Sequence, residues 1–211
     1  LKPVAVTPCS SDVHTVFGGG SKKQDNLVLG HECIAEVVSV GENVCDFKTG
    51  DRVAVPAITP DWREKSIQEG NDRHASAPFS GHQLGRTQPG VFSERFLIKD
   101  ADTTLAHIPQ KISEEQALMS VDVVTTGFTG AEYADIKIGD TVCVIGIGPI
   151  GLMAVAGAKL RGAARIIAVG TRPKCVQLAK YYGATDVLSY KEGDIVQQVK
   201  ELTNAIGVDA T

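Results

Sequence analysis

Polar and apolar residues follow a strand-like pattern in the first half of the chain. Residues 1–7 alternate loosely and residues 34–40 alternate clearly, which is typical of strands with one buried face. Residues 52–56 form a further predicted strand that a proline closes, and residues 91–98 predict another. Residues 59–90 are polar and rich in glycine and proline, so we expect a long loop there.

The second half of the chain carries short apolar runs instead. Residues 142–145 and 165–169 suit parallel strands that are buried on both faces, and a third strand is expected at 186–190. Between the first two of these strands, the sequence predicts a helix that extends to Leu160. Gly162 follows it, at a place where a helix commonly ends. Further helices are expected to begin near Ser113 and to cover residues 124–133 and 194–202.

A glycine-rich turn follows the first of these apolar runs at once. Its residues are Gly146, Ile147, Gly148, Pro149, Ile150 and Gly151. A strand, this turn, a helix and a second strand make up the dinucleotide-binding unit. Its first glycine permits the tight turn, its second lets the backbone approach a pyrophosphate, and its third allows close packing of helix and strand.

The same stretch has two other interpretations. Residues 142–158 contain no charged or polar side chain, and this length is close to the roughly 20 residues of a membrane span. Four glycines and a proline in that stretch disfavour a continuous helix, so a span is not expected. A glycine-rich turn without a ligand is the remaining alternative.

Composition narrows the class of protein. The chain has 211 residues, 43% of them hydrophobic and 22% charged, and these are ordinary values for a globular protein. A net charge of −4 and the lack of a basic run argue against nucleic-acid or anionic-membrane partners. The five cysteines include no CxxC pair, which fits a reducing cytoplasmic location.

Cys9 and His31 offer a thiolate and an imidazole within the β-rich half. A catalytic zinc ion needs three protein ligands from cysteine, histidine and carboxylate side chains, but spacing alone does not identify the third. By themselves, Cys9 could equally be a small buried hydrophobic residue and His31 a hydrogen-bonded core histidine.

Several segments together resemble one family. They are VAVTPCSSDVHTVFGG, VLGHECIAEVVSVGENV, GDRVAVP and DVVTTGFTGAEYADIKIGDTVCVIGIGPIGLM. They resemble the zinc-dependent medium-chain alcohol dehydrogenases, especially the NADP-dependent secondary-alcohol dehydrogenases of anaerobic bacteria and protists. The resemblance covers nearly the whole chain. It implies an α/β fold class, with a GroES-like β-rich catalytic domain at 1–123 followed by a Rossmann doubly wound parallel-sheet domain at 124–211.

The resemblance also implies roles for individual residues. Cys9, His31 and Asp122 match the ligands of the catalytic zinc ion, and Glu32 matches a glutamate that lies behind the metal and sometimes binds it. Asp12 matches a carboxylate that orients the histidine ligand.

Ser11 and His14 match the hydroxyl and imidazole groups of a proton relay to solvent. The implied chemistry is coherent: zinc lowers the pKa of the alcohol, the relay removes its proton, and hydride passes to the nicotinamide.

Residues after the second apolar run indicate the type of cofactor. NAD-specific sites carry an acidic residue there, which binds the ribose hydroxyls, whereas this chain has Gly170, Thr171 and Arg172. Glycine leaves room for a 2′-phosphate, and the next two residues offer a hydroxyl donor and a guanidinium. Tyr190 matches a position that packs beside this phosphate in the related branch. We therefore expect NADP(H), although Arg172 could also be a solvated surface residue.

Three departures from the family pattern affect the expectations. Ala35 replaces a family glycine, which is a mild backbone change. In the loop at 74–90, His82 stands where close relatives carry a pocket tryptophan, which leaves Ala57 and Ile58 as candidate walls for the substrate. No cysteine lies between Cys45 and Cys143, so we expect no structural zinc.

The predicted function is a zinc-dependent oxidoreductase that transfers hydride between NADP(H) and a secondary alcohol or its ketone (or an aldehyde). Alternatives are a zinc-free quinone or enone reductase of the same fold, which would lack the zinc ligand set, and an inactive cofactor-binding fragment. A fragment is expected because only half of a six-stranded Rossmann sheet is accounted for and the chain begins at Leu1. By resemblance we also expect a homo-oligomer, a tetramer.

Overall fold

The structure, a computed structural model, describes residues 1–18, 26–70 and 81–211. The chain forms two compact units, Leu1–Asp122 and Val123–Thr211. Each unit builds its own sheet and its own hydrophobic core.

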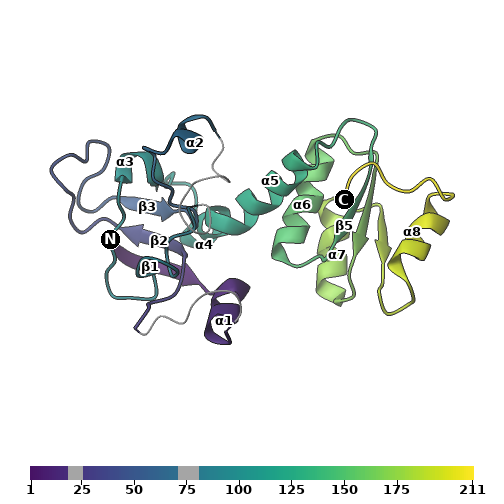
Figure 1. The fold of residues 1–211 in the computed structure, drawn as a ribbon, viewed down its shortest axis with the longest axis horizontal. Coiled ribbons are helices and arrows are strands. Elements are labelled where there is room, and N and C mark those ends of the chain that lie inside the picture. The colour runs from purple at the N-terminus through teal and green to yellow at the C-terminus, as the bar shows by residue number, and fades with distance from the viewer. Residues whose placement is uncertain (19–25, 71–80) are drawn as a thin grey trace. The chain divides into compact units, whose positions relative to one another are not determined.

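The first unit is organised around a small antiparallel sheet of four strands in the order β1-β2-β3-β4. These are β1 (Lys2–Thr7), β2 (Glu32–Glu36), β3 (Arg52–Val55) and β4 (Ala106–His107) (Figure 1). β2 is central and almost wholly buried, because its side chains enter cores on both faces of the sheet. Cys33 and Ala35 pack with one cluster and Ile34 packs with another.

Short helices complete the first unit. They are α1 (Ser10–Val16), α2 (Lys65–Gln68), α3 (Ala101–Thr104) and α4 (Glu114–Met119), and a π-helical turn, η2 (Ser120–Val124), follows α4. The expected helix start near Ser113 is confirmed. The Ser113 hydroxyl accepts a hydrogen bond from the Gln116 amide at 3.3 Å, and the Gln116 side chain accepts one from the Ser113 amide at 3.1 Å.

Two strand predictions in this unit need correction. Residues 91–98, all of them described, form no strand, and only 91–94 are bends. Their hydrogen bonds go to two separate segments instead of to one neighbouring strand: the Val91 amide donates to the Gly30 carbonyl at 3.0 Å, and Phe96 exchanges hydrogen bonds with Leu1 at 3.0 and 2.9 Å. The strand expected at 34–40 is β2, which ends at Glu36, because Val37 pairs with the turn that ends at Asp51. The expected loop 59–90 contains α2, and its residues 71–80 lie outside the described parts.

The second unit is a parallel sheet in the order β5-β6-β7, formed by β5 (Thr141–Ile145), β6 (Arg165–Val169) and β7 (Asp186–Leu188). Val142 pairs with Ile166 of β6 and also forms a parallel bridge with Ala210, so Ala210 lies on the opposite edge of β5. Two neighbours on opposite edges place β5 inside the sheet, as in a doubly wound fold.

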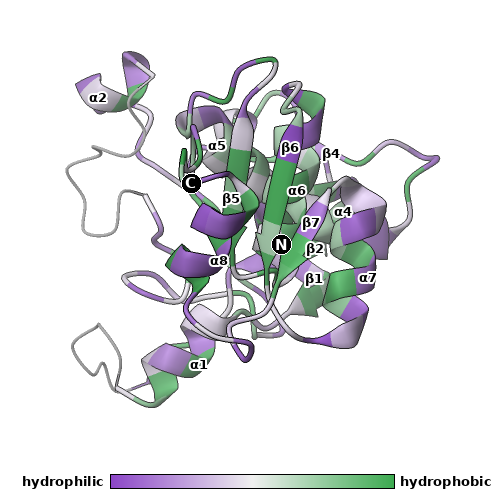
Figure 2. Cartoon of the chain, turned by 90° about the vertical axis from the view of Figure 1, so that its right-hand side faces the viewer, coloured by the Kyte–Doolittle hydropathy of each residue, from purple (hydrophilic) through white to green (hydrophobic). Residues whose placement is uncertain are grey.

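Helices cover both faces of this sheet. They are α5 (Thr125–Tyr133), α6 (Pro149–Leu160), α7 (Pro173–Tyr182) and α8 (Ile195–Leu202). Figure 1 shows α6 and α7 on one side of the strands and α8 on the other. β6 serves both cores, since Ile166 and Ala168 pack toward α6 and α7 while Ile167 and Val169 pack toward α8. The strand is accordingly hydrophobic along its middle in Figure 2. The continuous apolar runs of the sequence follow from this two-sided burial.

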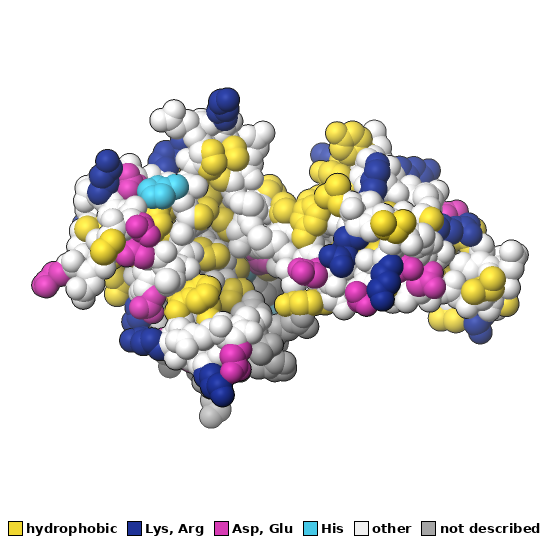
Figure 3. Space-filling view, turned by 90° about the horizontal axis from the view of Figure 1, so that it is seen from above, with side chains coloured by type: hydrophobic (Ala, Val, Ile, Leu, Met, Phe, Trp, Pro, Cys, Tyr) yellow, Lys and Arg dark blue, Asp and Glu magenta, His cyan; other side chains and the backbone are white. Residues whose placement is uncertain are grey.

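Residues 142–158 do not form the membrane span that was considered as an alternative. It folds as β5, the glycine-rich turn and the 12-residue helix α6. Over the described ranges, no helix has both the length and the hydropathy needed to cross a membrane. On the face in Figure 3, Lys and Arg side chains are interspersed with Asp and Glu.

Candidate functional site

Four potential metal ligands converge in the first unit. The ligand atoms of Cys9, His31, Glu32 and Asp122 all lie within 4.8 Å of one another. The register of the sheet brings the first three together, because Thr7 at the end of β1 pairs with Glu32 at the start of β2. Cys9 lies just beyond the end of β1, so it reaches the residues that begin β2.

Asp122 arrives from a segment far away in the sequence. It lies in η2, where the preceding Val121 is 6% exposed and packs in the same cluster as Ile34 of β2. The Val121 carbonyl also accepts a hydrogen bond from the Ala57 amide at 3.2 Å. Packing of Val121 therefore holds Asp122 beside β2. The π-helical turn is a conformation often found at functional sites.

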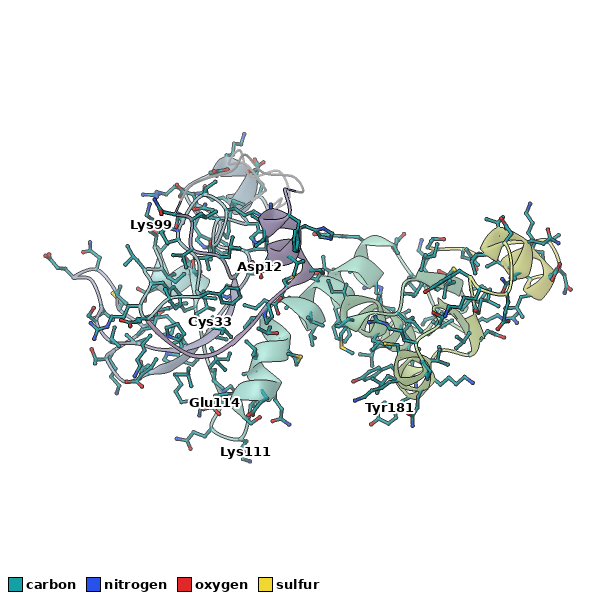
Figure 4. The ribbon with its side chains drawn as sticks, turned by 90° about the horizontal axis from the view of Figure 1, so that it is seen from below. Asp12, Cys33, Lys99, Lys111, Glu114 and Tyr181 are labelled. Atoms are coloured by element: carbon teal, nitrogen blue, oxygen red, sulfur yellow. The ribbon has the colours of Figure 1, made fainter. Side chains whose placement is uncertain are left out.

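Asp12, which Figure 4 labels on α1, contacts the Nδ1 side of the His31 ring, whereas the other potential ligands face Nε2. One carboxylate oxygen lies 3.5 Å from His31 Nδ1 and accepts a hydrogen bond from the Gly30 amide at 3.1 Å. The other oxygen accepts one from the Cys9 amide at 2.9 Å. Asp12 thus links the segments that carry two potential ligands and directs His31 Nε2 toward the others.

The opposite nitrogen of His31 faces acidic groups. His31 Nε2 lies 3.6 Å from an Asp122 oxygen and 3.9 Å from a Glu32 oxygen, which are too far for good hydrogen bonds. Burial alone would lower the pKa of His31, but the carboxylates of Asp12 and Asp122 raise it to about 10. Burial and the nearby Asp122 raise the pKa of Glu32.

The donor set fits a zinc ion. His31 Nε2 and Glu32 Oε2 are buried and have no hydrogen-bond partner within the described parts of the chain. Such buried polar atoms need compensation, and a cation held among them would supply it. A cysteine sulfur, an imidazole nitrogen and carboxylate oxygens are the ligand types of catalytic zinc sites. Cys33, the residue after Glu32, does not belong to the group; burial raises the pKa of its thiol to about 12.

The two predicted relay residues lie on α1, which begins directly after Cys9. Ser11 is half-buried, and His14 is exposed to solvent. The helix therefore gives the hydroxyl less contact with solvent than the imidazole has.

The predicted substrate-wall residues lie around the segment that follows β3. Ala57 is 4% exposed and Ile58 is 40% exposed.

The ring of His82 lies edge-on to the ring of His31, with 4.5 Å between the ring centroids. Burial lowers the pKa of His82 to about 4, with further contributions from His31 and Arg86. The sequence marked His82 only as a departure from a family position; its contact with His31 depends on packing between distant segments.

The glycine-rich turn of the second unit has the geometry expected of it. Gly146 has a φ of +89°, in the left-handed region that favours glycine. A Cβ atom on Gly151 would lie 1.9 Å from the Gly146 carbonyl oxygen, so only glycine fits there. Gly148 is the N-cap of α6, and Pro149 and Ile150 start the helix, whose first amides have no partners in the helix itself.

The residues after β6 gather beside this turn. A Cβ on Gly148 would lie 3.5 Å from a terminal nitrogen of the Arg172 guanidinium. The Thr171 hydroxyl donates a hydrogen bond to the Tyr190 hydroxyl at 2.9 Å. Glycine is required at position 170 for a reason that the sequence did not indicate, because a Cβ atom there would lie 2.3 Å from Ile147 Cγ1. Glycine at 170 is therefore required by packing as well as by any room left for a phosphate.

A β-rich unit with a cysteine, histidine and carboxylate cluster, followed by a doubly wound unit with a glycine-rich turn, defines a class of metal- and nucleotide-dependent dehydrogenases. The chain belongs to the zinc-binding alcohol dehydrogenase family. The model of the alcohol dehydrogenase GroES-like domain matches residues 1–110, and that of the zinc-binding dehydrogenases matches residues 149–211. These matches confirm the family that the sequence motifs predicted, and they also confirm the predicted fold class.

Individual relatives agree with this membership. The chain is 57% identical over 210 residues to an NADP-dependent isopropanol dehydrogenase of Thermoanaerobacter brockii, with 100% of this chain and 60% of the relative covered. It is 51% identical over 209 residues to an enzyme of the same name from Entamoeba histolytica, with 99% of this chain and 57% of the relative covered. A zinc-dependent alcohol dehydrogenase from Streptococcus pneumoniae has a similar structure, with a TM-score of 0.87, 28% identity, and 98% and 59% of the two chains covered. The chain thus spans about 60% of the length of such relatives.

Proposed function

We propose that this chain carries the zinc and cofactor sites of an oxidoreductase that transfers hydride between NADP(H) and a secondary alcohol or its ketone. The observation that carries the proposal is the convergence of Cys9, His31 and Asp122, with a buried His31 Nε2 that lacks a partner within the described residues. Relatives named NADP-dependent isopropanol dehydrogenases support this substrate class.

Cys9, His31 and Asp122 would hold one zinc ion, with Glu32 behind them. Zinc bound there would supply Lewis-acid chemistry that acidifies the alcohol. Asp12 keeps the His31 ring oriented through Nδ1, so that Nε2 remains available to the metal. We propose no structural zinc, because the sequence lacks cysteines between Cys45 and Cys143.

Ser11 and His14 would move the proton of the alcohol to solvent. Their placement on α1 supports these roles, since Ser11 is half-buried and the imidazole of His14 is exposed. A positioned general base of this kind typically contributes about 10²–10⁴-fold to the rate.

The second unit would bind NADP(H) through the turn from Gly146 to Gly151. The first amides of α6 would hold the pyrophosphate. Arg172, with Thr171 and Tyr190 beside it, would recognise the 2′-phosphate, because a guanidinium pairs well with phosphate oxygens. We further propose a cytoplasmic homotetramer, on the basis of the cysteine pattern and of the family resemblance.

The proposal is tested on the protein expressed from its full reading frame. We expect one zinc ion per chain, and reduction of NADP during oxidation of propan-2-ol. Removal of the metal with a chelator should abolish turnover, and added zinc should restore it. Full turnover without metal would instead favour a zinc-free reductase, and cofactor binding without turnover of any alcohol or ketone would favour a binding protein.

A further inference from the structure

A buried side chain of the glycine-rich turn occupies the space beside Gly170. Ile147 is 4% exposed and packs in the core cluster that covers one face of the sheet. A Cβ atom on Gly170 would lie 2.3 Å from Ile147 Cγ1 and 2.9 Å from Ile147 Cδ1, but 3.7 Å from Ile147 Cβ. The last distance is an ordinary carbon–carbon contact, so the outer carbon atoms of Ile147 are what exclude a side chain from position 170.

The backbone on both sides of this contact is anchored. The Gly170 amide donates a hydrogen bond to the Leu188 carbonyl of β7 at 3.0 Å, and the Gly146 amide donates one to the Val169 carbonyl of β6 at 3.0 Å. Ile147 follows Gly146 directly and precedes the N-cap of α6. Any side chain at 170 must therefore displace Ile147 or the turn that carries it.

The conformation of Gly170 would itself allow a side chain. Gly170 does not have a positive φ, in contrast to Gly146. A carboxylate at this place in the fold binds the ribose hydroxyls of NAD(H), and it would repel the 2′-phosphate of NADP(H). Packing against Ile147, and not backbone strain, is thus what keeps an acidic residue out.

We propose that Ile147 determines the cofactor specificity of this chain. By keeping position 170 free of a side chain, it excludes the acidic residue that would favour NAD(H). This inference rests on the proposed function, in which NADP(H) binds to the turn and to the residues after β6. Displacing Ile147 would also move the backbone that leads into α6, whose first amides would hold the pyrophosphate.

The test measures binding of NADPH and NADH to variants of the full-length protein by cofactor fluorescence. Gly170→Asp alone should bind NADPH at least about 10-fold more weakly than the parent does, and it should bind NADH no more tightly, because the displaced turn offsets the new hydrogen bonds. Ile147→Ala/Gly170→Asp should bind NADH at least about 10-fold more tightly than Gly170→Asp does. Alanine removes both outer carbon atoms and keeps only the Cβ at 3.7 Å.

Two further double variants serve as matched controls. Ile147→Val/Gly170→Asp keeps the branched carbon atoms, including the one that Cβ would approach most closely, so it should bind NADH as weakly as Gly170→Asp does. Ile136 is also 4% exposed and belongs to the same cluster, but none of the three atoms nearest to a Cβ at 170 belongs to it. Ile136→Ala/Gly170→Asp therefore removes the same side chain elsewhere and should not increase NADH binding.

Thermal unfolding without cofactor tests the packing separately. Gly170→Ala adds only the Cβ atom and should lower the Tm of the parent by at least about 2 °C. In the Ile147→Ala background the same change should lower the Tm by less than about 1 °C, because the clashing atoms are gone.

The outcomes separate this inference from the proposed function. If the parent prefers NADPH but Gly170→Asp alone binds NADH as tightly as Ile147→Ala/Gly170→Asp does, the proposed function stands and the role of Ile147 is refuted. Equal losses of Tm in the two backgrounds would refute that role as well. If the parent binds neither nicotinamide cofactor, the proposed function fails and the role of Ile147 in specificity falls with it.

Discussion

The two candidate sites are built in opposite ways. The metal cluster of the first unit consists of side chains from three separate segments, which the sheet register and the packing of Val121 bring together. The nucleotide turn of the second unit consists mainly of backbone from one continuous stretch, where glycines are required at 146 and 151. The first site therefore depends on the identity of a few side chains, and the second depends on the absence of side chains.

The two units also differ in how their buried or partly buried charges are compensated. In the first unit, His31 Nε2 and Glu32 Oε2 are buried without a hydrogen-bond partner among the described residues, so the cluster needs a cation. In the second unit, the Asp186 carboxylate is compensated within the chain by bonds from Arg165 at 2.8 and 3.1 Å. A site that needs an external ion should respond to loss of one ligand far more strongly than a self-compensated pair responds to loss of its charge.

The largest effect is expected from Cys9→Ala in the full-length protein. Loss of one of three ligands should leave too few to hold zinc in place, so both zinc content and alcohol turnover should fall by more than about 100-fold. Metal analysis and NADPH absorbance measure the two quantities. Cys45→Ala, which removes an exposed cysteine of the same unit, should change neither. Full zinc occupancy in Cys9→Ala would remove Cys9 from the ligand set.

Gly151→Ala should break the backbone-built site with a single methyl group. Its Cβ would lie 1.9 Å from the Gly146 carbonyl oxygen, so the turn must change shape at a cost of about 3 kcal/mol. Binding of both NADP(H) and NAD(H) should weaken by more than about 100-fold, as cofactor fluorescence titration would measure.

Gly130→Ala is the matched control for this substitution. Gly130 lies in α5, and a Cβ there meets nothing within 4 Å. Alanine should raise the free energy of unfolding by about 0.5–1 kcal/mol and leave cofactor binding unchanged. Unchanged cofactor binding in Gly151→Ala would show that the turn tolerates side chains.

The contrast between local and distant contacts explains how far the sequence could be interpreted. The strand, turn and helix from 141 to 160 were predictable because their signals, an apolar run and spaced glycines, act between neighbours in the chain. Residues 91–98 look like a strand, yet Val91 and Phe96 bond to two different segments instead of to one neighbouring strand, and no local pattern encodes that choice of partners.

The metal cluster was predictable only in part for the same reason. The chemistry of their side chains indicated Cys9 and His31 as possible ligands, but Asp122 entered only through the family resemblance, because its position depends on η2 and on the packing of Val121. The exclusion of a side chain at Gly170 depends on contact with Ile147, and this too is visible only in the folded unit.

Arg172→Ala tests whether one side chain adds selectivity to the backbone-built site. A hydrogen bond to a charged group contributes about 1.5–3 kcal/mol, so NADP(H) should bind roughly 10- to 150-fold more weakly. NAD(H) binding should barely change, because NAD(H) has no 2′-phosphate. Lys180→Ala removes a positive charge near the other end of α7 and should affect neither cofactor. Equal weakening for the two cofactors would show that Arg172 does not recognise the phosphate.

The smallest effect is expected at the self-compensated pair. Hydrogen bonds from Arg165, with a further one from Thr185, lower the pKa of Asp186 and outweigh the opposing effect of burial. A lowered folded-state pKa contributes stability above the unfolded value of about 4, and this contribution is lost as the pH falls through the folded pKa. Because both side chains are partly exposed, Asp186→Asn should lower the free energy of unfolding at pH 7 by less than about 1 kcal/mol.

Denaturant titrations of parent and Asp186→Asn at several pH values measure this effect. The difference should shrink below about pH 4, where the carboxylate of the unfolded parent takes up a proton, and should disappear as the pH falls through the lower pKa of the folded state. Asp135→Asn, at an exposed pair with Lys137, should stay within the error of the parent. A loss at Asp186 as large as that expected from Cys9→Ala would mean that the second unit also depends on uncompensated charge, and the contrast between the two units would fail.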